Sequence, residues 1–137
     1  MIKINENNEY EISIKDYCFT LNAMFNDVPI DFLISLYELF IPYPNNKHST
    51  SVVIAENDEN GIIFVFSRLP LSEELYIIHS HDYKNIIKME ISHRDLALSL
   101  INNIKNQYSL FLNQYKNDES KIKFLLNYNK LIELLEF

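Results

Sequence analysis

The sequence predicts a single α+β domain in which an antiparallel sheet packs against helices. Its length of 137 residues fits one domain, which we assign to residues 1–137. Short apolar segments with turn signals between them occupy the first two thirds, and apolar residues at helical spacing occupy the last third. Hydrophobic residues make up 47% of the chain, more than disordered chains contain, so the chain can bury its own core.

The N-terminal region predicts a β-hairpin followed by helical segments. Apolar and polar residues alternate over 2–5 and again over 10–15, and a polar turn separates these two stretches. Beyond it, Asp16 is a candidate cap for a first helix, although residues 17–20 also fit a strand. Pro29 and Asp31 suit the first turn of a second helix, which we expect to end near residue 40.

Residues 51–91 predict an antiparallel meander, after a proline-containing polar loop over 41–50. The expected strands are 51–56, 62–67, 75–79 and 85–91. The Asn60-Gly61 pair is a hairpin-turn signal because both positions tolerate a positive φ. The unbroken apolar run over 62–66 predicts a central strand that is buried on both faces.

The C-terminal third predicts two helices that cover the sheet. Ser92 is a candidate N-cap, with Asp95 three residues later as its partner. Apolar residues then recur on one face from Leu96 to Leu112, which predicts one continuous helix. A polar stretch over 117–120 ends it, and a last helix spans 122–135.

Composition excludes several classes of function. A single glycine, Gly61, cannot build a glycine-rich phosphate loop, and no cofactor is expected. The net charge of -7 argues against nucleic acid and anionic membrane as partners. The lone Cys18 precludes an internal disulfide, and the polar start of the chain lacks the apolar core of a signal peptide. We therefore expect a cytoplasmic protein.

The negative charge is concentrated in the sheet-forming part of the chain. Residues 1–83 hold thirteen acidic and four basic side chains, a net charge of -9, whereas residues 84–137 hold six acidic and eight basic, a net charge of +2. An acidic surface on one side of a protein attracts a basic partner and accelerates encounter with it. Acidic excess also serves solubility alone, so both interpretations stand at this point.

A histidine-rich turn is the main candidate for chemistry. His79 and His81 are spaced to share one strand face and could hold a metal, with Asp82 or His93 as a third ligand. The alternative is that His79 ends a strand and His81 lies in an exposed turn. Residues 80–82 also contain the three residue types of a hydrolase triad, but neighbouring strand residues face opposite sides. We therefore assign no catalytic residue and do not expect an enzyme.

One segment of the sequence resembles a known family of proteins. The segment Asn85-Ile-Ile-Lys-Met-Glu-Ile91, which leads into Ser92-His-Arg-Asp-Leu-Ala-Leu-Ser-Leu-Ile101, resembles the immunity proteins of bacterial toxin systems, in particular of the contact-dependent growth inhibition type. The similarity extends over residues 86–112. It implies a tight inhibitor that binds the C-terminal domain of a cognate toxin, often a nuclease with a basic cleft, and it assigns no individual residue.

The acidic turns are the predicted binding residues for such a partner. The set is Glu56, Asp58, Glu59, Glu73, Glu74, Asp82 and Tyr83, with the tyrosine as an aromatic anchor. We expect a monomer or weak dimer. Two alternatives remain, a small metal-dependent hydrolase that uses His79, His81 and Asp82, and a non-catalytic adaptor subunit.

Overall fold

The computed structural model describes residues 1–21, 27–41, 49–56, 61–79 and 82–136, and for residues 49 and 82–84 only the backbone. It confirms the predicted class, because two antiparallel sheets and four helices form one small α+β domain. In chain order the elements are β1 (Ile2–Ile4), β2 (Tyr10–Ile14), β3 (Tyr17–Leu21), α1 (Val28–Phe40), β4 (Ser49–Glu56), β5 (Gly61–Leu69), β6 (Ser72–His79), β7 (Asp82–Glu90), α2 (His93–Asn106), α3 (Tyr108–Asn113) and α4 (Asp118–Leu135).

The smaller sheet contains three strands in the order β1-β2-β3, one more than the predicted hairpin. Residues 17–21 form a strand, so the first predicted helix is wrong over these residues. Asp16 therefore does not cap a helix there. Ile14 pairs with Tyr17 across a two-residue turn, and Lys15 takes the positive φ of 51° that such tight hairpin turns use. The tight turn holds β3 against β2, and this pairing overrides the helical spacing of its apolar residues.

The larger sheet is the predicted meander, with strand order β4-β5-β6-β7. All four strands begin earlier than expected, β4 at Ser49, β5 at Gly61, β6 at Ser72 and β7 at Asp82, because each continues the ladder with its neighbours. The central strand β5 is not buried on both faces. Phe64 and Phe66 are fully buried on one face, whereas Ile63 and Val65 on the other are only half-buried.

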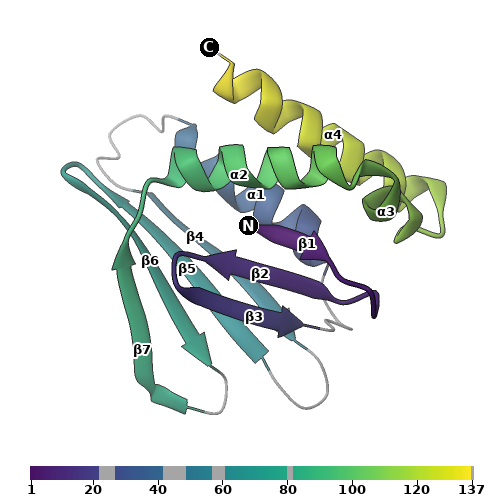
Figure 1. Ribbon diagram of the computed structural model, residues 1–137. Helices are drawn as coiled ribbons and strands as arrows, with labels where there is room; N and C mark the ends of the chain where they lie inside the picture. The colour runs from purple at the N-terminus through teal and green to yellow at the C-terminus, as the bar shows by residue number, and fades with distance from the viewer. Residues whose placement is uncertain (22–26, 42–48, 57–60, 80–81, 137) are drawn as a thin grey trace.

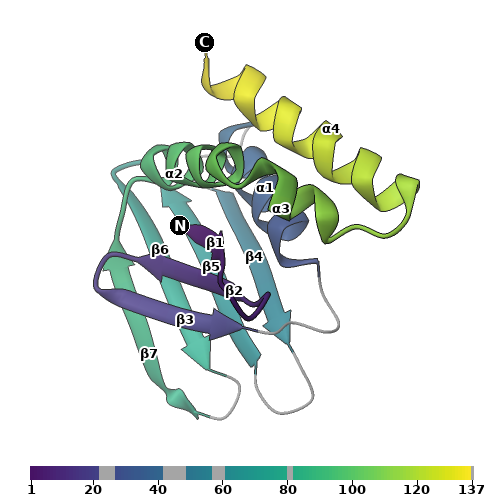
Figure 2. The ribbon, with the colours of Figure 1, turned by 45° about the vertical axis from the view of Figure 1, so that its right-hand side comes forward.

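The buried face of the larger sheet contacts three other elements. The ring of Phe64 lies 6.1 Å from that of Phe19 in β3 and 5.1 Å from that of Phe32 in α1. The ring of Phe66 lies 5.7 Å from His93 at the start of α2. In both ribbon views the β2–β3 hairpin crosses in front of the larger sheet and the long helices gather above it (Figures 1 and 2). The core is therefore one-sided with respect to this sheet.

Side-chain caps fix the helix boundaries. The Asp27 carboxylate accepts from the backbone N–H of Ile30 at the start of α1, and the Ser92 hydroxyl accepts from the N–H of Asp95, as predicted for α2. The predicted helix over 96–112 is in fact two helices, because Gln107 interrupts it. The Gln107 amide accepts from the N–H of Ile4 at 2.9 Å and donates to its carbonyl at 3.1 Å, which ties the break to β1.

No helix in the part of the chain that the structure describes combines the length and apolar character that crossing a membrane requires.

Two neighbouring valines in β4 provide a test of this one-sided core. Val53 is fully buried and Val52 is 48% exposed. We expect Val53→Ala to lower the free energy of unfolding by about 2 kcal/mol, since two buried methyl groups are lost and a cavity remains. The same truncation at Val52 should cost well under about 1 kcal/mol. Urea unfolding of both variants measures this, and equal losses would contradict the assignment of the two faces.

Candidate protein-binding surface

The outward face of the larger sheet, which we call the open face, is rich in apolar side chains. The strand register places them in adjacent rows, Val52 beside Val65 and Ile54 beside Ile63. Seven apolar residues form the centre of the open face, Val52, Ile54, Ile63, Val65, Tyr76, Ile78 and Ile86, and Leu69 lies on the same face where β5 ends. Because side chains alternate along a strand, these seven are the neighbours of the core residues that point the other way.

These side chains are accessible, and they are contiguous. Ile86 is 51% exposed and Ile54 37%, so no described segment of the chain packs over them. Half-buried Ile63, Val65 and Ile78 fill the centre of the same face. Exposed apolar patches of this kind on a small domain mark interaction sites, because water is a poor solvent for them.

A fixed carboxylate lies at one end of the open face. Glu74 in β6 is buried although its neighbours on that face are partly exposed. It accepts hydrogen bonds from the Tyr76 hydroxyl at 2.6 Å and from the Ser72 hydroxyl at 3.4 Å, and its oxygen lies 3.7 Å from the Lys88 ammonium. The hydrogen bond from Tyr76 is the main reason that the pKa of Glu74 is lowered. The Glu74 carboxylate is therefore ionised and fixed in position by its hydrogen bonds.

A second carboxylate extends this acidic end. Glu90 of β7 is the direct cross-strand partner of Glu74, and it is exposed. Lys88, one step further on the same face, places its ammonium between Glu74 and the Tyr76 ring, 5.8 Å from the ring centre. The charge of Lys88 is thus already paired within the protein. Glu90 adds an exposed carboxylate to this end, and the Lys15 ammonium donates to the backbone carbonyl of Glu90.

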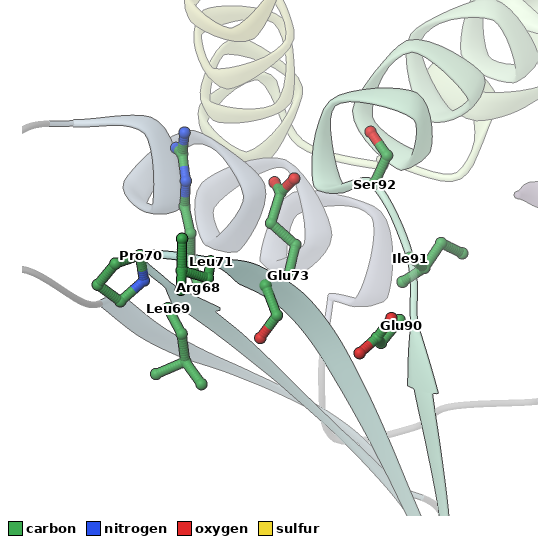
Figure 3. A pocket seen from close by; sticks show the side chains of 9 residues that line it. Arg68, Leu69, Pro70, Leu71, Glu73, Glu90, Ile91 and Ser92 are labelled. Carbon is green, nitrogen blue, oxygen red and sulfur yellow. The ribbon is translucent and has the colours of Figure 1, made fainter.

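A surface cleft of about 670 Å³ adjoins the acidic end. It is formed by the β5–β6 turn and the connection from β7 to α2, and its lining residues are Arg68, Leu69, Pro70, Leu71, Ser72, Glu73, Glu90, Ile91 and Ser92. Figure 3 shows the Arg68 and Glu73 side chains projecting toward the helices from neighbouring strands, with Glu90 on the other wall. Two carboxylates and one guanidinium therefore line a cleft with apolar walls.

The guanidinium of Arg68 has a structural task. It donates to the carbonyl of Leu39 at 3.0 Å and lies over the Phe40 ring, 4.9 Å from its centre. A positive charge suits this position because the C-terminal carbonyls of a helix carry a partial negative charge, and the last turn of α1 has no basic residue of its own. Arg68 thus fixes the end of α1 to the sheet.

His93 lies behind the cleft and is completely buried. Its Nε2 lies 2.9 Å from the Glu74 carbonyl oxygen, and its Nδ1 lies 3.6 Å from the Glu73 carboxylate. Burial is the main cause that lowers the pKa of His93, opposed by the Glu74 carbonyl and the Glu73 charge. The imidazole is therefore neutral near pH 7, and it joins the start of α2 to β6.

A separate titratable cluster surrounds the start of α1. The Asp27 carboxylate also accepts from the Tyr115 hydroxyl at 3.0 Å, and burial raises the pKa of Asp27. Burial and the charge of Asp27 also raise the pKa of Tyr10 to about 12. Helix capping accounts for this cluster, because its carboxylate is already used by the α1 backbone.

The predicted acidic residues fall into two groups. Glu56 ends β4 and is exposed; Asp58 and Glu59 lie outside the described residues. Glu73 and Glu74 are not at a turn, as the sequence suggested, but inside β6 at the opposite end of the sheet. Six residues of extended strand, about 20 Å, separate these two ends. The acidic turns therefore do not form one cluster.

The histidine-rich turn is only partly described. His79 ends β6 and pairs with Asp82, and its ring lies 5.6 Å from that of Phe19. Asp82 and Tyr83 belong to β7 by their backbone, and His81 lies outside the described residues. Among the residues that the structure describes, no three His, Cys, Asp or Glu side chains are placed to hold a metal ion.

Sequence reasoning missed the apolar character of the open face and the role of His93. The signal for the first was present in the run over 62–66, which was interpreted as burial on both faces. A strand with one exposed face cannot be told in sequence from a strand buried on both faces when the residues of its exposed face are also apolar. His93 was considered as a third metal ligand and, more simply, as part of the helix cap with Ser92 and Asp95, since nothing near it in sequence points to Glu73 or Glu74.

Comparison of the chain with models of protein families, with curated proteins and with solved structures yields no match.

The burial of His93 predicts a pH dependence of stability. The pKa of His93 is lowered in the folded protein, so the unfolded chain binds the proton more tightly. His93 therefore contributes stability that is present above its unfolded pKa of about 6.5 and is lost as pH falls through the folded value. We expect the ring signals of His93 to titrate below pH 6.5 in an NMR titration. Titration of His93 at or above pH 6.5 would contradict the proposed burial effect.

Proposed function

We propose that this protein is an inhibitory binding protein of the immunity type, which neutralises a basic protein partner through the open face. The observation that carries the proposal is the composition of that face. A contiguous apolar centre lies between Glu56 at one end and Glu74 with Glu90 at the other. Such a surface provides both an apolar contact area and a defined charge pattern.

The two parts of the surface would contribute differently to binding. Burial of the apolar side chains supplies affinity, which at protein interfaces is concentrated in a few central residues. Carboxylates at the rim steer a basic partner and select against acidic ones. Glu74 is already ordered by Tyr76 and Ser72, so binding to it costs little side-chain entropy.

The charge pattern favours a basic partner over a second copy of this chain. Two copies that met through the open face would each bring an acidic end, and the total charge of -7 adds a general repulsion. A basic protein is repelled neither by the acidic end of the open face nor by the net negative charge. The excess acidity of residues 1–83 supports the same choice, because these residues include β4, β5 and β6.

The direct test of this function uses the protein encoded by the neighbouring gene. If the proposal is right, that protein is toxic when expressed alone, co-expression with this chain restores growth, and the two form a complex in pull-down and calorimetry. Absence of both rescue and complex formation with the neighbouring product would overturn the immunity function.

A matched pair of isoleucines tests the surface. Ile86 on the open face is 51% exposed, and Ile122 on α4 is 64% exposed. We expect Ile86→Asp to weaken partner binding about tenfold or more, because a charge would be buried in the apolar centre. Ile122→Asp serves as the control and should leave affinity unchanged. Calorimetry measures both, and a larger loss with the α4 variant would place the interface elsewhere.

A second matched pair tests electrostatic steering. The double variant Glu56→Lys, Glu90→Lys reverses charge on the open face, and Glu119→Lys, Glu133→Lys makes the same net change on α4. We expect the first to slow association about tenfold at low salt and to flatten its salt dependence, since steering depends on local charge. The second should change the association rate only slightly. Equal effects in stopped-flow measurements would show that net charge alone matters.

A further inference from the structure

The contacts of His93 reveal a missing hydrogen-bond donor beside the cleft. A carbonyl oxygen can only accept, so the Nε2 atom that faces the Glu74 carbonyl must carry the hydrogen. In the neutral imidazole, Nδ1 then presents a lone pair. This Nδ1 is fully buried, has no hydrogen-bond partner among the described residues, and lies 3.6 Å from an oxygen of Glu73.

Two acceptors therefore face each other. A buried acceptor without a donor is unfavourable, and a neighbouring carboxylate makes it more so. Two cations near the cleft among the described residues do not resolve this. Arg68 is turned toward Leu39 and Phe40, and Lys15 donates to the Glu90 carbonyl. Glu73 itself is one-third exposed and lines the cleft, so a group that enters from outside can reach its carboxylate.

We propose that the cleft is a binding site for one cationic side chain, a lysine or arginine, of a partner protein. The charged head would donate to Glu73, and Glu90, which lines the cleft from the open-face side of β7, would add negative charge at a longer distance. The aliphatic stem would lie along Leu69, Pro70 and Ile91, as long basic side chains commonly do on apolar surface. The inference rests on the proposed function in one respect, that the side chain belongs to the basic partner.

Protons compete with this ligand. A proton on His93 Nδ1 supplies the missing donor to Glu73 and neutralises the charge that holds the cation. The charged groups around the imidazole and the cleft are Glu73 from β6, Glu90 from β7, Arg68 from β5 and Lys15 from the β2–β3 turn, whose ammonium donates to the Glu90 carbonyl. Because linkage is reciprocal, affinity for the cation decreases as His93 becomes protonated.

The experiment is an NMR titration of the full chain with N-acetyl-arginine methylamide, whose only charge is its guanidinium. The matched neutral probe is the corresponding citrulline derivative. We expect the arginine probe to shift the amide signals of Ser92 and His93 at millimolar concentration, and the citrulline probe to shift them at least about tenfold less. Binding should weaken about threefold or more when His93 is protonated.

Two variants in the cleft and one control variant on α4 locate the effect. Glu73→Gln should abolish the shifts, Glu90→Gln should reduce them, and Glu133→Gln on α4 should leave them unchanged. Equal binding of the two probes, no shifts at the cleft, or full binding to folded Glu73→Gln would overturn the site.

The outcome is separable from that of the proposed function. A chain that binds the arginine probe but not the neighbouring gene product keeps the cationic site and loses the immunity function. If the chain binds the neighbouring gene product but the arginine probe does not shift the signals of the cleft, the immunity function stands and the cationic site is wrong.

Discussion

The alternation of side chains along β5 is the constraint on which the rest of this structure depends. Phe64 and Phe66 point to the side where β3, α1 and α2 pack, and this fixes the register of the whole meander. A shift of one residue would exchange every inward and outward side chain, so the core cannot form without also presenting the open face. The same contacts that stabilise the domain therefore define its candidate binding surface.

Strand β6 connects that surface to the helices. Glu73 and Glu74 are adjacent, so their side chains lie on opposite faces of the strand, one toward His93 and one among Tyr76, Ser72 and Lys88. The carbonyl of Glu74 also binds the buried imidazole. The acidic end of the open face and the cleft thus share one rigid piece of backbone, and a change in the protonation of His93 acts next to both.

Much of the fold was predictable, because its elements follow from local patterns. The meander, the cap at Ser92 and the helix after Pro29 all come from periodicity and turn chemistry. The errors share a tertiary cause. Pairing with β2 makes residues 17–21 a strand, and the bonds from Gln107 to Ile4 divide a helix whose apolar period continues through it. The candidate site was less predictable, since it joins Glu73 and Glu74 to His93, which is nineteen residues or more away in sequence, and depends on which face of β5 stays uncovered.

The central claim is that the open face, and not the helical side, contacts the partner. The most direct measurement is an NMR titration of isoleucine δ-methyl groups with the neighbouring gene product, because isoleucines occur on both sides of the domain. The account predicts that the methyl signals of Ile54, Ile63, Ile78 and Ile86 shift or broaden while that of Ile122 on α4 does not. Perturbation of Ile122 with no change in the four methyl groups of the open face would contradict it.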